Sequence, residues 1–120
     1  TIQLITIRSS LINQKTIKAD CIETACEAFE ENINATYSVA WIDCLAKGKS
    51  LGRSVLMLGE HAEEGGLEVD IKDPVSVPFN TPSALLNSIT MKTFNGAYWH
   101  KAKHNCTQTV PLMPYFYPLD

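Results

Sequence analysis

The chain has 120 residues, of which 45% are hydrophobic and 19% are charged, and its formal net charge is −3. This length suits one domain with its own apolar core, and the acidic balance argues against a nucleic-acid-binding protein, which needs a basic patch. No apolar run approaches the roughly 20 residues that span a bilayer, so the sequence gives no indication of membrane contact.

The four cysteines, Cys21, Cys26, Cys44 and Cys106, form no C-x-x-C pair. No secretory signal is visible, and an even number of cysteines does not imply disulfides without one. We therefore expect reduced thiols and a cytoplasmic protein.

Residues 2–18 carry many apolar side chains and predict one long strand or two short ones. Ile5 and Ile7 fall on one parity, whereas Ile2 and Leu4 fall on the other. This mixture predicts a bulge, or burial on both faces, near residues 8–10.

Residues 20–33 form the clearest predicted helix. Asp20 is expected to cap its first turn, with Glu23 completing a capping box. One apolar stripe recurs at helical spacing and comprises Ile22, Ala25, Cys26, Phe29 and Ile33. The remaining glutamates fall on the opposite face, which we interpret as a solvated surface.

Residues 37–62 predict two strands joined by a charged, Gly-containing loop. Tyr37, Val39 and Trp41 share one face of the first strand. The second strand, residues 53–60, contains four consecutive apolar residues, which suits a strand covered on both faces. Gly52 precedes this strand and can relieve backbone strain.

Beyond residue 62 the pattern is less regular, and the prolines between residues 74 and 82 predict an extended loop. A short helix is expected to open at residues 81–83 and to end near Asn95 and Gly96. We expect residues 97–105 to be strand or loop, and residues 107–117 to be an extended edge strand or crossing segment. Together the elements predict an α+β fold, an antiparallel sheet with helices on one face that resembles part of a ferredoxin-like domain.

Three matches stand out in the sequence, the first of them made of two short motifs. Tyr-Ser-Val-Ala-Trp-Ile-Asp at residues 37–43 is followed by Leu-Gly-Arg at residues 51–53. Tyr-Trp-His-Lys stands at residues 98–101, and Tyr-Phe-Tyr-Pro-Leu-Asp at residues 115–120. In this order they resemble the substrate-binding (cap) domain of FAD-linked oxidoreductases of the vanillyl-alcohol-oxidase superfamily. The branch that they resemble most contains the decaprenylphosphoryl-ribose and sugar-lactone oxidases.

The resemblance implies that residues 1–120 are a single domain and a fragment of a longer FAD-dependent oxidoreductase. Its substrate would be a carbohydrate-type alcohol or lactone, oxidised by hydride transfer to the flavin. FAD would be bound by a domain absent from this chain, and the sequence has no G-x-G-x-x-G loop or P-loop. The isolated fragment is therefore expected to be inactive.

The resemblance also implies a set of substrate-binding residues. Trp41 and Val39 would form a wall of the cavity, although the spacing of Trp41 also suits an ordinary half-buried sheet residue. Phe116 aligns with a tyrosine of the branch but has no hydroxyl to donate a hydrogen bond, and Leu119 would be an apolar contact. Lys101 is a candidate for an anionic substrate group, while an ordinary surface lysine is the alternative.

Other interpretations remain open. The chain is alternatively a stand-alone ferredoxin-like interaction or small-ligand-binding module that dimerises through an edge strand. His100, His104 and Cys106 are alternatively zinc ligands, although no fourth ligand is evident. As a fragment, the chain is expected to form a homo-oligomer that covers surface normally packed against the rest of its parent.

Overall fold

The computed structural model describes residues 2–69 and 87–118. At its centre is a four-stranded antiparallel sheet in the order β2-β3-β1-β4. The strands are β1 (Leu11–Ala19), β2 (Tyr37–Ile42), β3 (Ser54–His61) and β4 (Cys106–Pro111). Helix α1 (Ile22–Glu31) follows β1, and α2 (Ser88–Lys101) lies between β3 and β4, which gives the β-α-β-β-α-β element order of ferredoxin-like domains. A 3-10 turn, η1 (Gly48–Ser50), and a short helix, α3 (Leu112–Phe116), complete the described elements.

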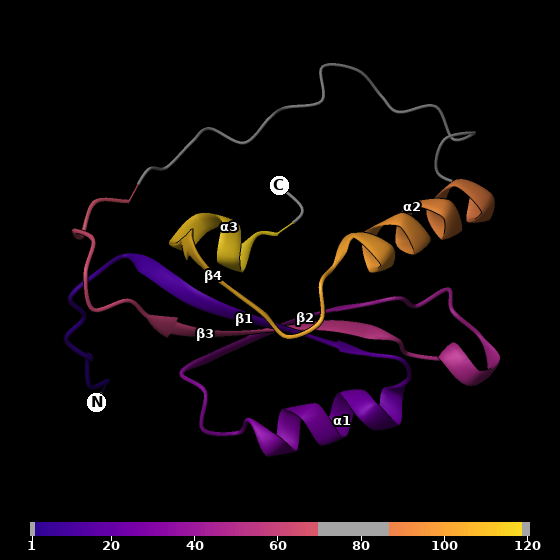
Figure 1. Cartoon of the computed structure of the whole chain (residues 1–120), viewed down its shortest axis with the longest axis horizontal. Coiled ribbons are helices and arrows are strands. Elements are labelled where there is room, and N and C mark those ends of the chain that lie inside the picture. Colours follow the sequence, from indigo (N-terminus) through magenta and orange to yellow (C-terminus); the bar gives the residue numbers. More distant parts are fainter. Residues whose placement is uncertain (1, 70–86, 119–120) are drawn as a thin grey trace.

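The expected α+β class and antiparallel sheet are confirmed, but the helices lie on both faces of the sheet (Figure 1). Helix α1 covers one face, where Ala28 packs with Leu56. Helices α2 and α3 lie over the opposite face, where Tyr115 of α3 packs with Ile12 and Met57. The pocket described below lies on this second face.

The predicted hairpin of residues 37–62 is confirmed. Strand β2 pairs with β3 along its whole length, with Tyr37 opposite Gly59 and Trp41 opposite Val55. Because β3 is covered on both faces, its residues 55–58 are all buried, between 1% and 7% exposed. The connection needs Gly52, whose φ of +70° is unfavourable for other residues and where an added Cβ would lie 2.8 Å from Ile22 Cβ of α1.

The N-terminal strand is shorter than predicted. It begins at Leu11, and residues 2–8 form no strand. Its neighbours end at the same place, because Ile12 pairs with His61 and Leu11 with Pro111, the last residues of β3 and β4. The segment before Ser9 has no strand partner within residues 2–69 and 87–118 and lies outside the sheet.

Helix α1 begins two residues later than predicted. Cys21 rather than Asp20 is the N-cap, and its backbone N–H donates to Thr24 Oγ1 over 3.2 Å. The predicted apolar stripe is only partly buried. Ala25 and Ala28 face the sheet, while Ile22 and Phe29 are 39% and 38% exposed, because the small alanines allow the helix to approach the strands closely.

The C-terminal third differs most from expectation. The predicted helix start at residues 81–83 lies outside the described residues, and α2 continues past Asn95 and Gly96 to Lys101. The helix persists because Asn95 and Trp99 are buried beneath it. Strand β4 is an edge strand as predicted, but residues 112–116 are helical, with Pro114 in the first turn, where its missing N–H costs no helical hydrogen bond.

Candidate functional site

The sheet face beneath α2 and α3 is organised in rows of side chains from neighbouring strands. Thr16 of β1 pairs with Met57 on one side and with Cys106 on the other. Met57 pairs in turn with Val39. Paired residues of an antiparallel sheet present their side chains on the same face, so this row crosses all four strands.

The next row towards α3 contains Gln14, paired with Gly59 and with Gln108. Gly59 leaves room for the ring of Tyr115, since a Cβ at Gly59 would lie 2.6 Å from Tyr115 Cζ. The Tyr115 hydroxyl donates to the Met57 carbonyl oxygen over 2.9 Å. Tyr115 therefore fixes α3 on the sheet and closes one end of the face.

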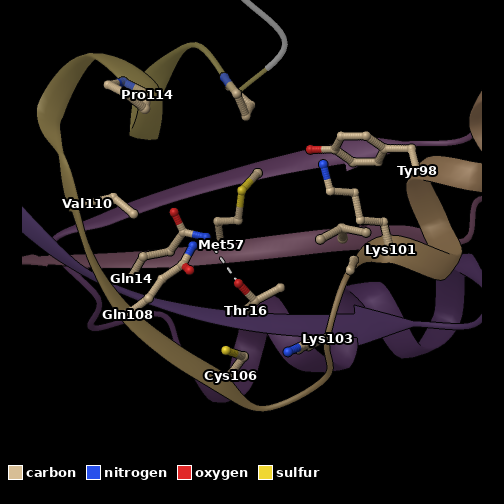
Figure 2. A pocket seen from close by; sticks show the side chains of 13 residues that line it. Gln14, Thr16, Met57, Tyr98, Lys101, Lys103, Cys106, Gln108, Val110 and Pro114 are labelled. Carbon is tan, nitrogen blue, oxygen red and sulfur yellow. Dashed lines mark hydrogen bonds between the residues drawn. The ribbon is translucent and has the colours of Figure 1, made fainter.

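Between α2 and α3 this face is hollowed into a pocket of about 440 Å³ (Figure 2). Its floor is formed by β1, β3 and β4, and its walls by the end of α2, the residues after it, and the region of α3. The described residues that line it are Gln14, Thr16, Val55, Met57, Tyr98, Lys101, Ala102, Lys103, Cys106, Gln108, Val110, Pro114 and Pro118.

The floor of the pocket has a polar half and an apolar half. Gln14, Thr16 and Gln108 bring amide and hydroxyl groups from β1 and β4, whereas Val55 and Met57 bring apolar surface from β3. Such a combination suits a small ligand that carries hydroxyl groups on a carbon skeleton.

The wall formed at the end of α2 is basic. Lys101 and Lys103 line the pocket, and none of its described lining residues is acidic. Tyr98 lies on the same wall, and burial raises the pKa of its hydroxyl, which stays a neutral hydrogen-bonding group at physiological pH. This end of the pocket therefore favours an anionic or electron-rich ligand group.

A buried carboxylate holds α2 in position. Asp43 is 2% exposed, and its Oδ2 accepts from Arg53 Nη2 over 2.7 Å and Nε over 2.9 Å. Its Oδ1 accepts from Asn95 Nδ2 of α2 over 2.7 Å and from the Leu45 amide over 3.0 Å. Burial alone would raise the pKa of Asp43, but the hydrogen bonds from Arg53, Asn95 and Leu45, with the charge of Arg53, lower it below the ordinary value.

The aromatic side chains of α2 pack on the same end of the sheet. Trp99 is 8% exposed, and the Lys18 ammonium lies 4.3 Å from its ring centroid. The Tyr98 ring lies 4.7 Å from the ring of Trp41 on β2. Together with Asp43, these contacts fix the pocket wall that α2 provides.

The five residues that the sequence predicts to bind substrate lie in different surroundings in the structure. Lys101 lines the pocket. Trp41 does not line it but supports the lining residue Tyr98, and Val39 packs beside Met57 on the same face of the sheet without lining the pocket. Phe116 lies against Tyr37, with ring centroids 5.3 Å apart. Leu119 lies outside the described residues. Their roles in binding stay predictions.

The zinc interpretation finds no geometric support. Within residues 2–69 and 87–118, no group of three or more His, Cys, Asp or Glu side chains is arranged to hold a metal ion. His104 Nδ1 instead accepts from the Lys18 amide over 3.2 Å, and Cys106 faces the pocket. His100 is the helical residue of the three, and the other two follow α2 in a turn and in β4.

Sequence reasoning missed the polar floor. Gln14 and Thr16 share the parity of the buried residue Ile12 in a strand, which is an inward position for polar side chains. In β4, Gln108 and Cys106 likewise share the parity of the apolar residue Val110. Polar residues at inward positions of two neighbouring strands were the available signal, but the pairing of β1 with β4 is not visible in the sequence.

Comparisons with known proteins give one informative relationship. No protein-family model matches the chain. It is 26% identical over 96 residues to the decaprenylphosphoryl-beta-D-ribose oxidase of Mycolicibacterium smegmatis, a match that covers 72% of this chain and 21% of that protein. The chain thus spans about a fifth of the length of this relative, whose name is that of the branch that the sequence motifs resemble. In the described part of the chain, no helix has the length and apolar character needed to cross a bilayer.

Proposed function

We propose that the chain is the substrate-binding part of an FAD-dependent oxidoreductase that acts on a carbohydrate-type alcohol or lactone. The observation that carries this proposal is the similarity to decaprenylphosphoryl-beta-D-ribose oxidase, which extends over 72% of the chain. The pocket supports it, because its floor offers both polar and apolar contacts to a small ligand.

The residues of this chain do not fit FAD itself. A pocket of about 440 Å³ lined by two lysines lacks the phosphate-binding loop that dinucleotide cofactors need, and the sequence has no Gly-rich fingerprint. The redox chemistry would therefore come from FAD held by another domain of a longer parent chain.

The part of this chain would be to bind and orient the substrate. Thr16 and the glutamines of the floor would hydrogen-bond to substrate hydroxyl groups, and Met57 would contact the C–H face of the sugar. Lys101 and Lys103 would attract an anionic group attached to it. Such fixed contacts hold a reacting carbon in one position relative to the rest of the active site.

The experiment that tests the proposal is purification of the protein encoded by the complete gene. We expect a longer chain with a Gly-rich cofactor domain and stoichiometric FAD, visible as yellow colour and as flavin fluorescence after denaturation. A parent without bound flavin, even when refolded with added FAD, would contradict the proposal.

The complete β-α-β-β-α-β element order favours a second candidate, a stand-alone ferredoxin-like ligand-binding or interaction module. Among the described strands, β4 is an edge strand with exposed residues 107–109, and none of these strands pairs with its outer side. A reading frame that stops soon after residue 120 would select this candidate over the first.

A further inference from the structure

Two side chains of the pocket floor are deeply buried although they are polar. Gln14 and Thr16 are each 7% exposed. Gln14 Nε2 donates to Thr16 Oγ1 over 3.0 Å, which fixes the position of both groups. Neither residue makes another side-chain hydrogen bond within the described part of the chain.

The hydrogen bond between the two leaves one atom of each group available. Figure 2 shows the Gln14 carbonyl oxygen on the side of the amide that is turned away from Thr16. Every fully buried polar side-chain atom of residues 2–69 and 87–118 has a partner, so this unpaired oxygen keeps contact with the pocket space. Thr16 Oγ1 accepts from Gln14, and its own hydrogen stays available for donation.

From this arrangement, and resting on the proposed function above, we infer that Gln14 and Thr16 recognise a vicinal diol of the sugar. One ligand hydroxyl donates to Gln14 Oε1, and the neighbouring ligand oxygen accepts from Thr16 Oγ1. An acceptor and a donor on two residues of β1 that face the same pocket match two adjacent hydroxyl groups, because each hydroxyl can donate and accept.

The pair also excludes other groups. A phosphate or carboxylate oxygen only accepts, so it gains nothing from Gln14 Oε1 and is directed to Lys101 and Lys103 on the wall at the end of α2. A deoxy sugar would cover the Gln14 oxygen without giving it a hydrogen bond, which makes its binding weaker by about tenfold or more.

The test uses the 120-residue chain, labelled with ¹⁵N and titrated with methyl β-D-ribofuranoside in an NMR experiment. We expect a saturable shift of the Gln14 side-chain NH₂ signals with a dissociation constant in the millimolar range, roughly 1–30 mM. The 2-deoxy counterpart should bind about tenfold more weakly. Equal binding of the two sugars, or no saturable shift at about 100 mM of either, would overturn the inference.

Variants of the same chain provide matched controls. Gln14→Met keeps the side-chain length but removes the acceptor, and it should abolish the preference for the diol. Thr16→Val should also abolish this preference. The preference should be retained in Thr16→Ser, which keeps the hydroxyl, and in Lys15→Met, which lies on the exposed side of β1. A folded Gln14→Met variant that still prefers the ribofuranoside over its 2-deoxy counterpart would overturn the inference. If a variant does not fold, the comparison of the two sugars on the unmodified chain still tests it.

The outcomes separate this inference from the proposed function. A chain that prefers the diol, from a parent that holds no flavin, would retain the inference and remove the proposed function. A flavin-containing parent whose cap binds both sugars equally would retain the proposed function and remove the inference about Gln14 and Thr16.

Discussion

Arg53 binds Asp43 through two nitrogen atoms, and this contact joins two sequence motifs that are separated along the chain. Asp43 ends the Tyr-Ser-Val-Ala-Trp-Ile-Asp motif, and Arg53 ends the Leu-Gly-Arg motif. The carboxylate also accepts from Asn95 of α2. The contact therefore connects the β2–β3 hairpin to the helix that forms one wall of the pocket.

Replacement of Asp43 by alanine should destabilise the chain by about 2–4 kcal/mol, because Arg53, Asn95 and the Leu45 amide all lose their acceptor. We expect the lower end of this range, since the Arg53 side chain is 21% exposed and can bind water instead. Urea unfolding followed by circular dichroism measures the change. Asp20→Ala, which removes an exposed carboxylate, is the control and should change stability by less than about 0.5 kcal/mol.

The same carboxylate predicts a loss of stability in acid. The pKa of Asp43 is lower in the folded chain than in the unfolded chain, where it is about 3.9. Its contribution is therefore fully present above pH ~4 and is lost as the pH falls through the lower folded pKa. Urea midpoints at decreasing pH should fall more steeply for the wild type than for Asp43→Asn. Parallel curves for the two proteins would show that Asp43 does not titrate in this way.

Gly59→Ala should destabilise the chain by about 1–3 kcal/mol, because its Cβ would lie 2.6 Å from the Tyr115 ring. The loss should be smaller in a Tyr115→Leu background, which removes the ring, and a double-mutant cycle measures this difference. Gly96→Ala is the control. It lies in α2 with nothing within 4 Å of the added atom, so it should stabilise the helix by about 0.5–1 kcal/mol.

Tyr115 also predicts a loss of stability in alkali. Burial, with smaller effects of Glu60 and Tyr37, raises the pKa of Tyr115 to about 12. A raised folded pKa gives a contribution that is full below the unfolded value of about 10 and is lost as the pH rises towards about 12. Tyr115→Phe should cost about 1 kcal/mol near neutral pH, and the gap to the wild type should narrow above pH ~10 in urea unfolding. A gap that stays constant with pH would contradict this.

Local patterns in the sequence predicted the elements whose partners are close in the chain. The alternation of Tyr37, Val39 and Trp41 and the apolar run of β3 were sufficient for the hairpin. The end of α2 was predicted wrongly because Gly96 is a common helix terminator. The helix continues there since Asn95 and Trp99 are held by distant residues, which no local signal contains.

The site depended on long-range pairing even more. Lys101 was among the predicted substrate-binding residues and lines the pocket, but the polar floor requires β1 to lie beside β4, which are almost 90 residues apart in the chain. The placement of α3 depends on the space left by the missing side chain of Gly59, which the Tyr115 ring fills, and α1 begins at Ile22 after its N-cap Cys21 because the sheet extends through Ala19. Sequence motifs indicated a resemblance to FAD-linked oxidoreductases, whereas strand pairing determined which side chains face the pocket.

The exposed N-terminal segment predicts self-association. Ile2, Leu4 and Ile5 are 90%, 88% and 80% exposed, an unusual arrangement for apolar side chains so close together. We propose that copies of the isolated chain cover this surface by forming dimers or larger oligomers. Light scattering coupled to size-exclusion chromatography should show a concentration-dependent mass, which Leu4→Asp with Ile5→Asp should reduce to that of a monomer. A wild-type chain that is monomeric at all concentrations would remove the proposal.

In the function proposed above, the pocket between α2 and α3 binds the substrate of an FAD-dependent parent enzyme. The most direct measurement adds a ribofuranoside phosphate anaerobically to the full-length parent and follows the loss of flavin absorbance. The same titration is made on its Lys101→Met variant and on a control variant, Lys47→Met, at the distant loop tip. We expect Lys101→Met to raise the concentration of ribofuranoside phosphate that bleaches half of the flavin by about tenfold, while Lys47→Met behaves as the wild type. A parent without flavin, or the same half-maximal concentration in all three proteins, would show that the pocket does not have this role.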